Sequence, residues 1–140
     1  MKSILSSVKL WLAVTAMLSL VLLQACSSSS STPTASATGP AVSVDLTAQN
    51  FTFDKTTITV PAGAAVTINF NNKDTGIQHN FAVYQTGSAS GTATGVIFAG
   101  KLVTGPGTAT YTFTAPATKG TYFFRCDVHP TQMTGSFIVQ

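Results

Sequence analysis

The stretch "CDVHPTQM", residues 126–133, places a thiol, an imidazole and a thioether within eight positions, at Cys126, His129 and Met133. Cys126 is the only cysteine after residue 26, so it has no disulfide partner within the part of the chain that can fold. Thiolate and thioether ligands favour Cu(I), and imidazole suits both oxidation states of copper. The spacing therefore indicates a metal centre.

A second imidazole is available in "IQHNFAV", where His79 is two residues from the apolar Ile77 and Phe81. In "YFFRC", Cys126 is likewise two residues from the aromatic Phe124. Side chains two apart share one face of a strand, so His79 and Cys126 are both expected to point inward. Two imidazoles and a thiolate in one plane, with a long axial thioether, form the ligand set of a mononuclear blue-copper site. We predict that His79, Cys126, His129 and Met133 bind one copper ion, which cycles between Cu(I) and Cu(II).

Other functions must be weighed against this interpretation, because a single histidine, cysteine or methionine more often packs than ligates. Zinc is disfavoured by the thioether, which is a poor zinc ligand, and a binuclear copper site would need a second cysteine in the loop. Cys126, a histidine and Asn80 could form a protease-like set, but such cysteines begin helices. We therefore expect no enzyme. An adhesive sandwich would not explain the four donors, whereas copper delivery or storage uses the same ligands and remains the alternative to electron transfer.

Residues 41–140 are predicted to form one all-β domain. Short runs rich in Val, Ile, Thr, Phe and Tyr alternate with Gly, Pro, Asn and Asp, which is typical of strands and turns. We expect seven or eight strands in a Greek-key β-sandwich or barrel, with residues 86–95 as a surface loop. The expected strands are residues 41–48, 56–60, 65–70, 79–85, 96–103, 108–115, 121–126 and 135–139.

The N-terminus indicates export. Residues 1–25 begin with Lys2 and Lys9 and continue with the apolar run "LWLAVTAMLSLVLL", which suits a signal peptide. The following "LQAC" resembles a bacterial lipobox, in which Cys26 is lipidated and becomes the mature N-terminus. The alternatives are ordinary signal cleavage nearby or an uncleaved N-terminal anchor. Residues 26–40, rich in Ser, Thr and Ala, are expected to form a flexible tether about 20 Å long. We therefore expect a protein outside the cytoplasm, anchored to a bacterial membrane on its periplasmic or extracellular face.

The charge of the chain argues against a nucleic-acid partner. Seven basic residues face four acidic ones, which gives a formal net charge of +3. Removal of residues 1–25 takes away two lysines, so the mature charge falls to about +1. A domain with so few charges and no basic patch is not expected to bind nucleic acid.

"HNF" and "CDVHPTQM", together with "ITVPAG", "NFNNKD" and "YTFTAPATKGTYFFRC", resemble the cupredoxin family, especially its plastocyanin-like and auracyanin-like members. The resemblance covers nearly all of residues 41–140. It implies an eight-stranded Greek-key sandwich in which His79 supplies one ligand and the Cys126–Met133 loop supplies three. It also implies a monomer that carries single electrons between redox partners such as cytochromes or membrane oxidoreductases.

The resemblance further implies that Asn80, after the first histidine, ties the two ligand segments together by hydrogen bonds near the thiolate. Its partner in the family is often a hydroxyl residue, whereas this chain has Asp127. A carboxylate near the site favours Cu(II), so we expect Asp127 to lower the reduction potential.

His129 lies in a loop and is followed by Pro130, so its outer ring edge is expected to be the electron port. We expect its neighbours to be Pro130, Met133 and residues 61–63, and the loop 86–95 to lie far away. With few charges nearby, association with a redox partner should be weak, transient and only mildly salt-dependent.

Overall fold

The computed structural model describes residues 37–140. The signal peptide, the lipidation of Cys26 and all but the last residues of the tether lie outside the described residues and stay predictions. Every regular element in the described part of the chain is a strand. Within residues 37–140 there is no helix of the length and apolar character that a membrane crossing requires.

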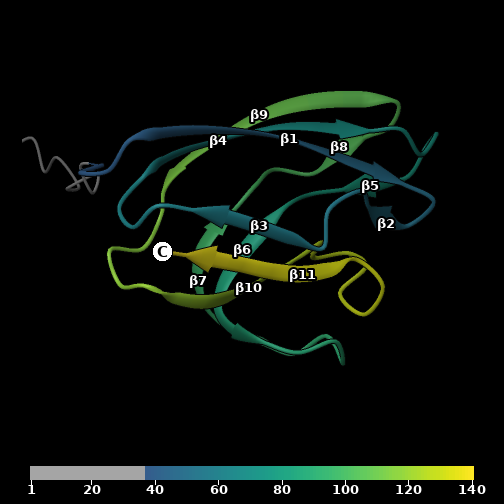
Figure 1. The fold of residues 1–140 in the computed structure, drawn as a ribbon. Coiled ribbons are helices and arrows are strands. Elements are labelled where there is room, and N and C mark those ends of the chain that lie inside the picture. Colours follow the sequence, from purple (N-terminus) through teal and green to yellow (C-terminus); the bar gives the residue numbers. More distant parts are fainter. Residues whose placement is uncertain (1–36) are drawn as a thin grey trace, which may run out of the picture. The chain divides into compact units, whose positions relative to one another are not determined.

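Two sheets face each other in a β-sandwich, which confirms the predicted fold class (Figure 1). The order in the first sheet is β2 (Thr52–Phe53), β1 (Ala41–Gln49), β4 (Ala65–Asn72) and β9 (Gly107–Thr114). The order in the second is β3 (Thr57–Val60), β11 (Thr134–Val139), β10 (Gly120–Arg125), β6 (Ala82–Gly87) and β7 (Ala93–Ala99). A separate ladder joins β5 (Gln78–His79) to β8 (Val103–Thr104).

Two of the predicted strands are each divided in the structure. The run 79–85 contributes its first residue to β5 and its later part to β6, and the run 96–103 is divided between β7 and β8. The division arises because His79 pairs with Val103 in the small ladder, whereas Val83 pairs with Phe124 in the large sheet. This break moves His79 out of the large sheet and toward the end of β10.

The predicted loop 86–95 is partly strand. β6 runs on to Gly87 and β7 begins at Ala93, so the two form a hairpin in which Thr86 pairs with Thr94. Small residues and threonine give no apolar alternation here, because this end of the hairpin is exposed to solvent on both faces. The sequence pattern therefore missed it.

Aromatic rings fill the space between the sheets. Phe70, Phe81, Phe124 and Phe137 are fully buried, and the ring of Phe81 lies 5.3 Å from that of Phe124. Burial of one such ring contributes about 1.5–3 kcal/mol. Because Phe124 lies two residues before Cys126, the same packing that builds the core also fixes the end of β10 from which the thiol extends.

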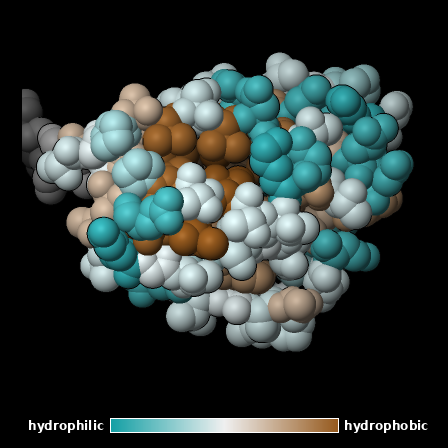
Figure 2. Space-filling view, in the orientation of Figure 1, coloured by the Kyte–Doolittle hydropathy of each residue, from teal (hydrophilic) through white to brown (hydrophobic). Residues whose placement is uncertain are grey.

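β1 and β3 lie beside each other on one face of the sandwich (Figure 1). β3 is one of the two edge strands of its sheet, and β1 has a neighbour on its outer side only at Ala48 and Gln49. Val42 and Val44 of β1 pack against the core but stay only partly buried. Figure 2 shows hydrophobic side chains reaching the surface between the two layers on this face.

We predict that Gly135→Ala destabilises the fold. Gly135 directly follows the first residue of β11, and a Cβ atom there would meet the Phe124 ring and lie 2.6 Å from the carbonyl oxygen of Thr56. Overpacking of this kind costs about 1–3 kcal/mol of unfolding free energy. Denaturant titration should show this loss, whereas Ser136→Ala, one residue further along, should stay within about 0.5 kcal/mol of the wild type. Equal stability of the two variants would contradict the close packing of β10 against β11.

Candidate metal centre

Three side chains from distant parts of the sequence converge at one end of the sandwich. The donor atoms of His79, Cys126 and His129 all lie within 4.8 Å of one another. His79 comes from β5, Cys126 directly follows β10, and His129 lies in the loop 126–133 between β10 and β11. In Figure 1 these elements meet at the right-hand end of the view, near β2 and β5. The structure thus brings together the three donors that the sequence predicted.

The three donor atoms fit a single metal ion. Cys126 Sγ lies 3.7 Å from His79 Nδ1 and 3.8 Å from His129 Nδ1, and the two Nδ1 atoms are 3.0 Å apart. A point equidistant from the three atoms lies about 2 Å from each, close to ordinary metal–imidazole and metal–thiolate distances. His79 and Cys126 are fully buried, and His129 is partly exposed. The arrangement is therefore trigonal, and solvent reaches it only beside His129.

Backbone hydrogen bonds close the ligand loop on itself. The Cys126 N–H donates to the Met133 carbonyl at 2.9 Å, and the Met133 N–H donates to the His129 carbonyl at 3.0 Å. The His129 N–H donates in turn to the Cys126 carbonyl at 3.3 Å. Met133 is fully buried. The loop therefore returns Met133 to the immediate vicinity of Cys126, as its predicted role as fourth donor requires.

Asn80 joins the two ligand segments. Its Oδ1 accepts a hydrogen bond from the Asp127 N–H at 2.8 Å, and its Nδ2 donates to Asp127 Oδ2 at 2.9 Å. The same Nδ2 donates to the Gly100 carbonyl at 3.0 Å. Asn80 follows one ligand and Asp127 follows another, so this pair of bonds fixes the separation of His79 and Cys126.

Asp127 is the centre of a wider polar network. Its carboxylate also accepts hydrogen bonds from the Tyr84 hydroxyl and from Arg125 Nε, the latter at 3.0 Å. Burial alone would raise the pKa of Asp127, but the bonds from Tyr84, Asn80 and Arg125 outweigh it and hold this pKa below its ordinary value. Since Arg125 compensates the charge, the effect of Asp127 on the reduction potential should be smaller than the sequence suggested.

His129 is held in the form that can bind a metal. Burial lowers its pKa, and repulsion from His79 lowers it further, while Asp74 acts in the opposite direction. The net direction is downward, so the neutral imidazole is favoured. A neutral imidazole offers the free ring nitrogen that ligation requires.

Two residues near the histidines were missed by sequence reasoning. Asp74 Oδ2 lies 2.9 Å from His79 Nε2, and the ring of Phe51 contacts both imidazoles edge-on, at centroid distances of 5.8 Å to His79 and 4.9 Å to His129. An aspartate five residues before a histidine gives a weak signal, and a phenylalanine in a turn gives none. Only the fold brings them to the site.

The predicted surroundings of the electron port are partly wrong. Residues 61–63 lie at the opposite end of the sandwich, where the Ala62 N–H donates to the Gln140 carbonyl and the Gly63 N–H donates to the Pro116 carbonyl. The loop 86–95 is close to the site, because Arg125 donates a hydrogen bond to the Gly91 carbonyl. A Cβ atom at Gly91 would lie 3.5 Å from Pro130. Strand length and direction decide these positions, and the sequence pattern carries neither.

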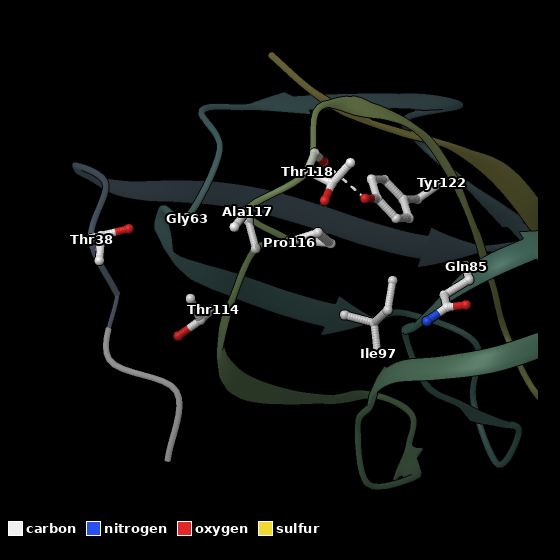
Figure 3. A pocket seen from close by; sticks show the side chains of 10 residues that line it. Thr38, Gly63, Gln85, Ile97, Thr114, Pro116, Ala117, Thr118 and Tyr122 are labelled. Carbon is white, nitrogen blue, oxygen red and sulfur yellow. Dashed lines mark hydrogen bonds between the residues drawn. The ribbon is translucent and has the colours of Figure 1, made fainter. Parts of the chain in front are cut away.

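One groove of the sandwich lies apart from the metal centre. It has a volume of about 660 Å³ and is lined by Gly63, Pro116, Thr118 and Tyr122, among others (Figure 3). Tyr122 lies near the beginning of β10, whereas Cys126 follows its end. The groove and the donor atoms therefore occupy opposite ends of the sandwich.

Comparison with known proteins decides the family. The model of the cupredoxin-like domain matches residues 14–139. The chain belongs to the cupredoxin-like family. Auracyanin-A from Chloroflexus aurantiacus is 34% identical to this cupredoxin, in an alignment that covers 74% of this chain and 77% of the relative.

Solved structures agree with this assignment. Auracyanin A, described as a "blue" copper protein from the same bacterium, aligns with a TM-score of 0.64 and 33% identity, covering 73% of this chain and all of its own. Dithionite-reduced auracyanin from Roseiflexus castenholzii aligns with a TM-score of 0.63 and 30% identity over 73% of this chain and 99% of its own. In this cupredoxin, His79, Cys126, His129 and Met133 form the donor set of a type 1 copper site.

The geometry opposes the protease interpretation of the same cysteine. Cys126 is fully buried and follows a strand, so its thiol is neither open to a substrate nor activated at a helix N-terminus. Asn80 bonds to Asp127 and Gly100, and no hydrogen bond joins it to a histidine among the described residues. The Cys-His-Asn arrangement of such proteases is therefore absent from the part of the chain that the structure describes.

We predict that Asn80→Ala destabilises this cupredoxin, because it leaves the partly buried Asp127 N–H and the Gly100 carbonyl without their partner. Loss of such bonds costs about 1–3 kcal/mol. Thermal or denaturant unfolding should show the change. Asn69→Ala removes an exposed amide that bonds to Ser43 and Asp45 on the surface, and it should have a much smaller effect. A similar loss in both variants would argue against the bridge between the ligand segments.

Proposed function

We propose that this cupredoxin is a one-electron carrier outside the cytoplasm, tethered to a bacterial membrane and containing one type 1 copper ion. The observation that carries the proposal is the preformed triangle of His79, Cys126 and His129 donor atoms around a buried thiol. The similarity to auracyanin A, which is described as a "blue" copper protein, supports the same cofactor. Bound copper would supply one-electron redox chemistry.

The protein part of this function is to hold the donors still. The β5–β8 ladder fixes His79, and β10 fixes Cys126. Asn80 joins the two segments that carry these ligands through its hydrogen bonds to Asp127. A site whose donors are held by strands and hydrogen bonds changes shape little between Cu(I) and Cu(II). Electron transfer benefits because little of the protein has to reorganise.

Two exposed apolar side chains lie at the surface beside His129. Phe51, in contact with the His129 ring, is 41% exposed, and the neighbouring Val128 is 43% exposed. We propose that a redox protein such as a cytochrome or a membrane oxidoreductase approaches the monomer here. Because no charged side chain flanks His129 along the loop from Val128 to Met133, association should be weak and only mildly dependent on salt.

The membrane tether is supported by the apolar run and lipobox-like "LQAC" before Cys26 and by the Ser-rich segment after it. A lipid on Cys26 would confine the domain to the membrane surface. Confinement raises the local concentration of the carrier near membrane-bound donors and acceptors. This compensates for the weak docking that an uncharged surface provides.

Copper delivery is the second candidate, and the partial exposure of His129 favours it, since an accessible ligand offers a route for ion exchange. The burial of His79, Cys126 and Met133 opposes it, because three of the four donors cannot be reached by a receiving protein unless the site opens. The two candidates differ in whether copper stays in the protein during turnover.

The ligand role of Cys126 predicts that Cys126→Ser abolishes the intense visible band which thiolate-to-copper charge transfer produces when Cu(II) is added to the full chain. Met133→Leu is the matched control, because removal of a weak axial donor should leave the band in place and raise the reduction potential. Visible spectra and potentiometry measure both effects. A full band in the serine variant would exclude a copper–thiolate bond.

The electron-carrier role predicts that the copper-loaded chain completes repeated cycles of reduction and oxidation with unchanged copper content. Metal analysis after each cycle, together with visible absorbance, provides the measurement. A chelator that accepts Cu(I) should be present in excess, so that released ion is not rebound. Stepwise loss of copper on reduction would favour delivery over electron transfer.

A further inference from the structure

Asp74 is a nearly buried carboxylate that contacts a metal ligand from behind. It lies in the connection between β4 and β5, its side chain is 10% exposed, and its Oδ2 lies 2.9 Å from His79 Nε2. The other ring nitrogen of His79, Nδ1, faces Cys126 and His129. With Asp74 as acceptor, the proton of a neutral His79 is held on Nε2 and Nδ1 is left free for the metal.

The same carboxylate anchors a strained turn. Asn50 and Phe51 join β1 to β2, and both have left-handed backbone conformations, with φ of 53° and 58°. Asparagine tolerates this region, but a bulky residue such as phenylalanine rarely adopts it, at a cost of about 1–2 kcal/mol. Asp74 Oδ1 accepts from the Asn50 N–H at 2.6 Å, and Oδ2 accepts from the Phe51 N–H at 3.0 Å.

The strained turn places one ring against both histidine ligands. The ring of Phe51 meets the imidazole of His129 at an interplanar angle of 78° and that of His79 at 89°. Phe51 is nonetheless among the few large apolar side chains exposed on the described surface. Backbone strain that persists at a site and holds a side chain in place points to a functional constraint.

Asp74 differs from Asp127 in how its charge is compensated. Arg125 forms an ion pair with Asp127, whereas the only ion pair of Asp74 among the described residues is with His79 itself. Burial would raise the pKa of Asp74, but the hydrogen bonds from Phe51, Asn50 and His79 outweigh it and keep this pKa below its ordinary value. The negative charge of Asp74 therefore acts on His79 without a nearby arginine or lysine that compensates it, unlike the charge of Asp127.

We propose that Asp74 is a positioning residue of the copper site, which orients His79 through Nε2 and at the same time holds the Phe51 turn over both histidine ligands. The proposal rests on the copper-binding function proposed above and deepens it. A carboxylate hydrogen-bonded to a ligating histidine makes that histidine a stronger donor. Asp74 therefore stabilises Cu(II) relative to Cu(I) and lowers the reduction potential.

The first test needs no copper and no variant. In the metal-free full chain at about pH 8, where an ordinary imidazole is neutral, the nitrogen chemical shifts of His79 should show the proton on Nε2. The Asn50 and Phe51 amide protons should exchange slowly with solvent although both residues lie in an exposed turn. A proton on Nδ1 of His79, or rapid exchange of both amides, would overturn the proposal.

The second test compares Asp74→Asn with Asp45→Asn. Asp45 is an exposed carboxylate that accepts a hydrogen bond from Asn69, so the control loses the same charge without touching a histidine. In Asp74→Asn the reduction potential should rise, Cu(II) should dissociate about 10- to 100-fold more readily in competition with a chelator, and the two turn amides should exchange faster. The control should show none of these changes.

The outcomes separate the two hypotheses. A wild-type chain with the thiolate band, combined with an Asp74→Asn variant whose potential, affinity and amide exchange match those of Asp45→Asn, would overturn the role of Asp74 alone. A wild-type chain without the band would overturn the proposed function and the role of Asp74 in a copper site with it. The metal-free nitrogen shifts would then still show whether Asp74 orients His79.

Discussion

The metal centre depends on the pair of hydrogen bonds between Asn80 and Asp127. His79 and Cys126 are 47 residues apart, and the strands that bear them belong to different ladders. A direct link between the residues that follow each ligand keeps the donor atoms together whether or not an ion is bound. The closed loop from Cys126 to Met133 and the packing of Phe124 then support donor segments that Asn80 and Asp127 have already joined.

The two carboxylates beside the site have different environments and hence different effects. Asp127 lies within a network of Tyr84, Asn80 and Arg125, so its charge is compensated and its contribution is mechanical. Asp74 lies behind His79 without a lysine or arginine in an ion pair with it among residues 37–140. One carboxylate thus fixes distances between segments, and the other orients a ligand and adds negative charge where it favours Cu(II).

The two ends of the sandwich have different surface features. At the ligand end, the partly exposed His129 contacts the exposed ring of Phe51 and lies between Val128 and Pro130 in the chain. At the opposite end lies the groove beside Pro116 and Tyr122. The separation follows from strand direction, because β10 begins at one end and delivers Cys126 at the other.

The sequence by itself determined the all-β fold and the four donors, because strand alternation and ligand chemistry are local properties, readable from "IQHNFAV" and "CDVHPTQM". It also indicated Asn80 and Asp127, through a family resemblance. Only the tertiary structure decided that Asp74 and Phe51 lie against the histidines, that residues 61–63 lie far from them and that Gly91 lies near Pro130. These contacts depend on where each strand ends and on which turn adopts a left-handed backbone. Such features arise from long-range pairing, which no local pattern encodes.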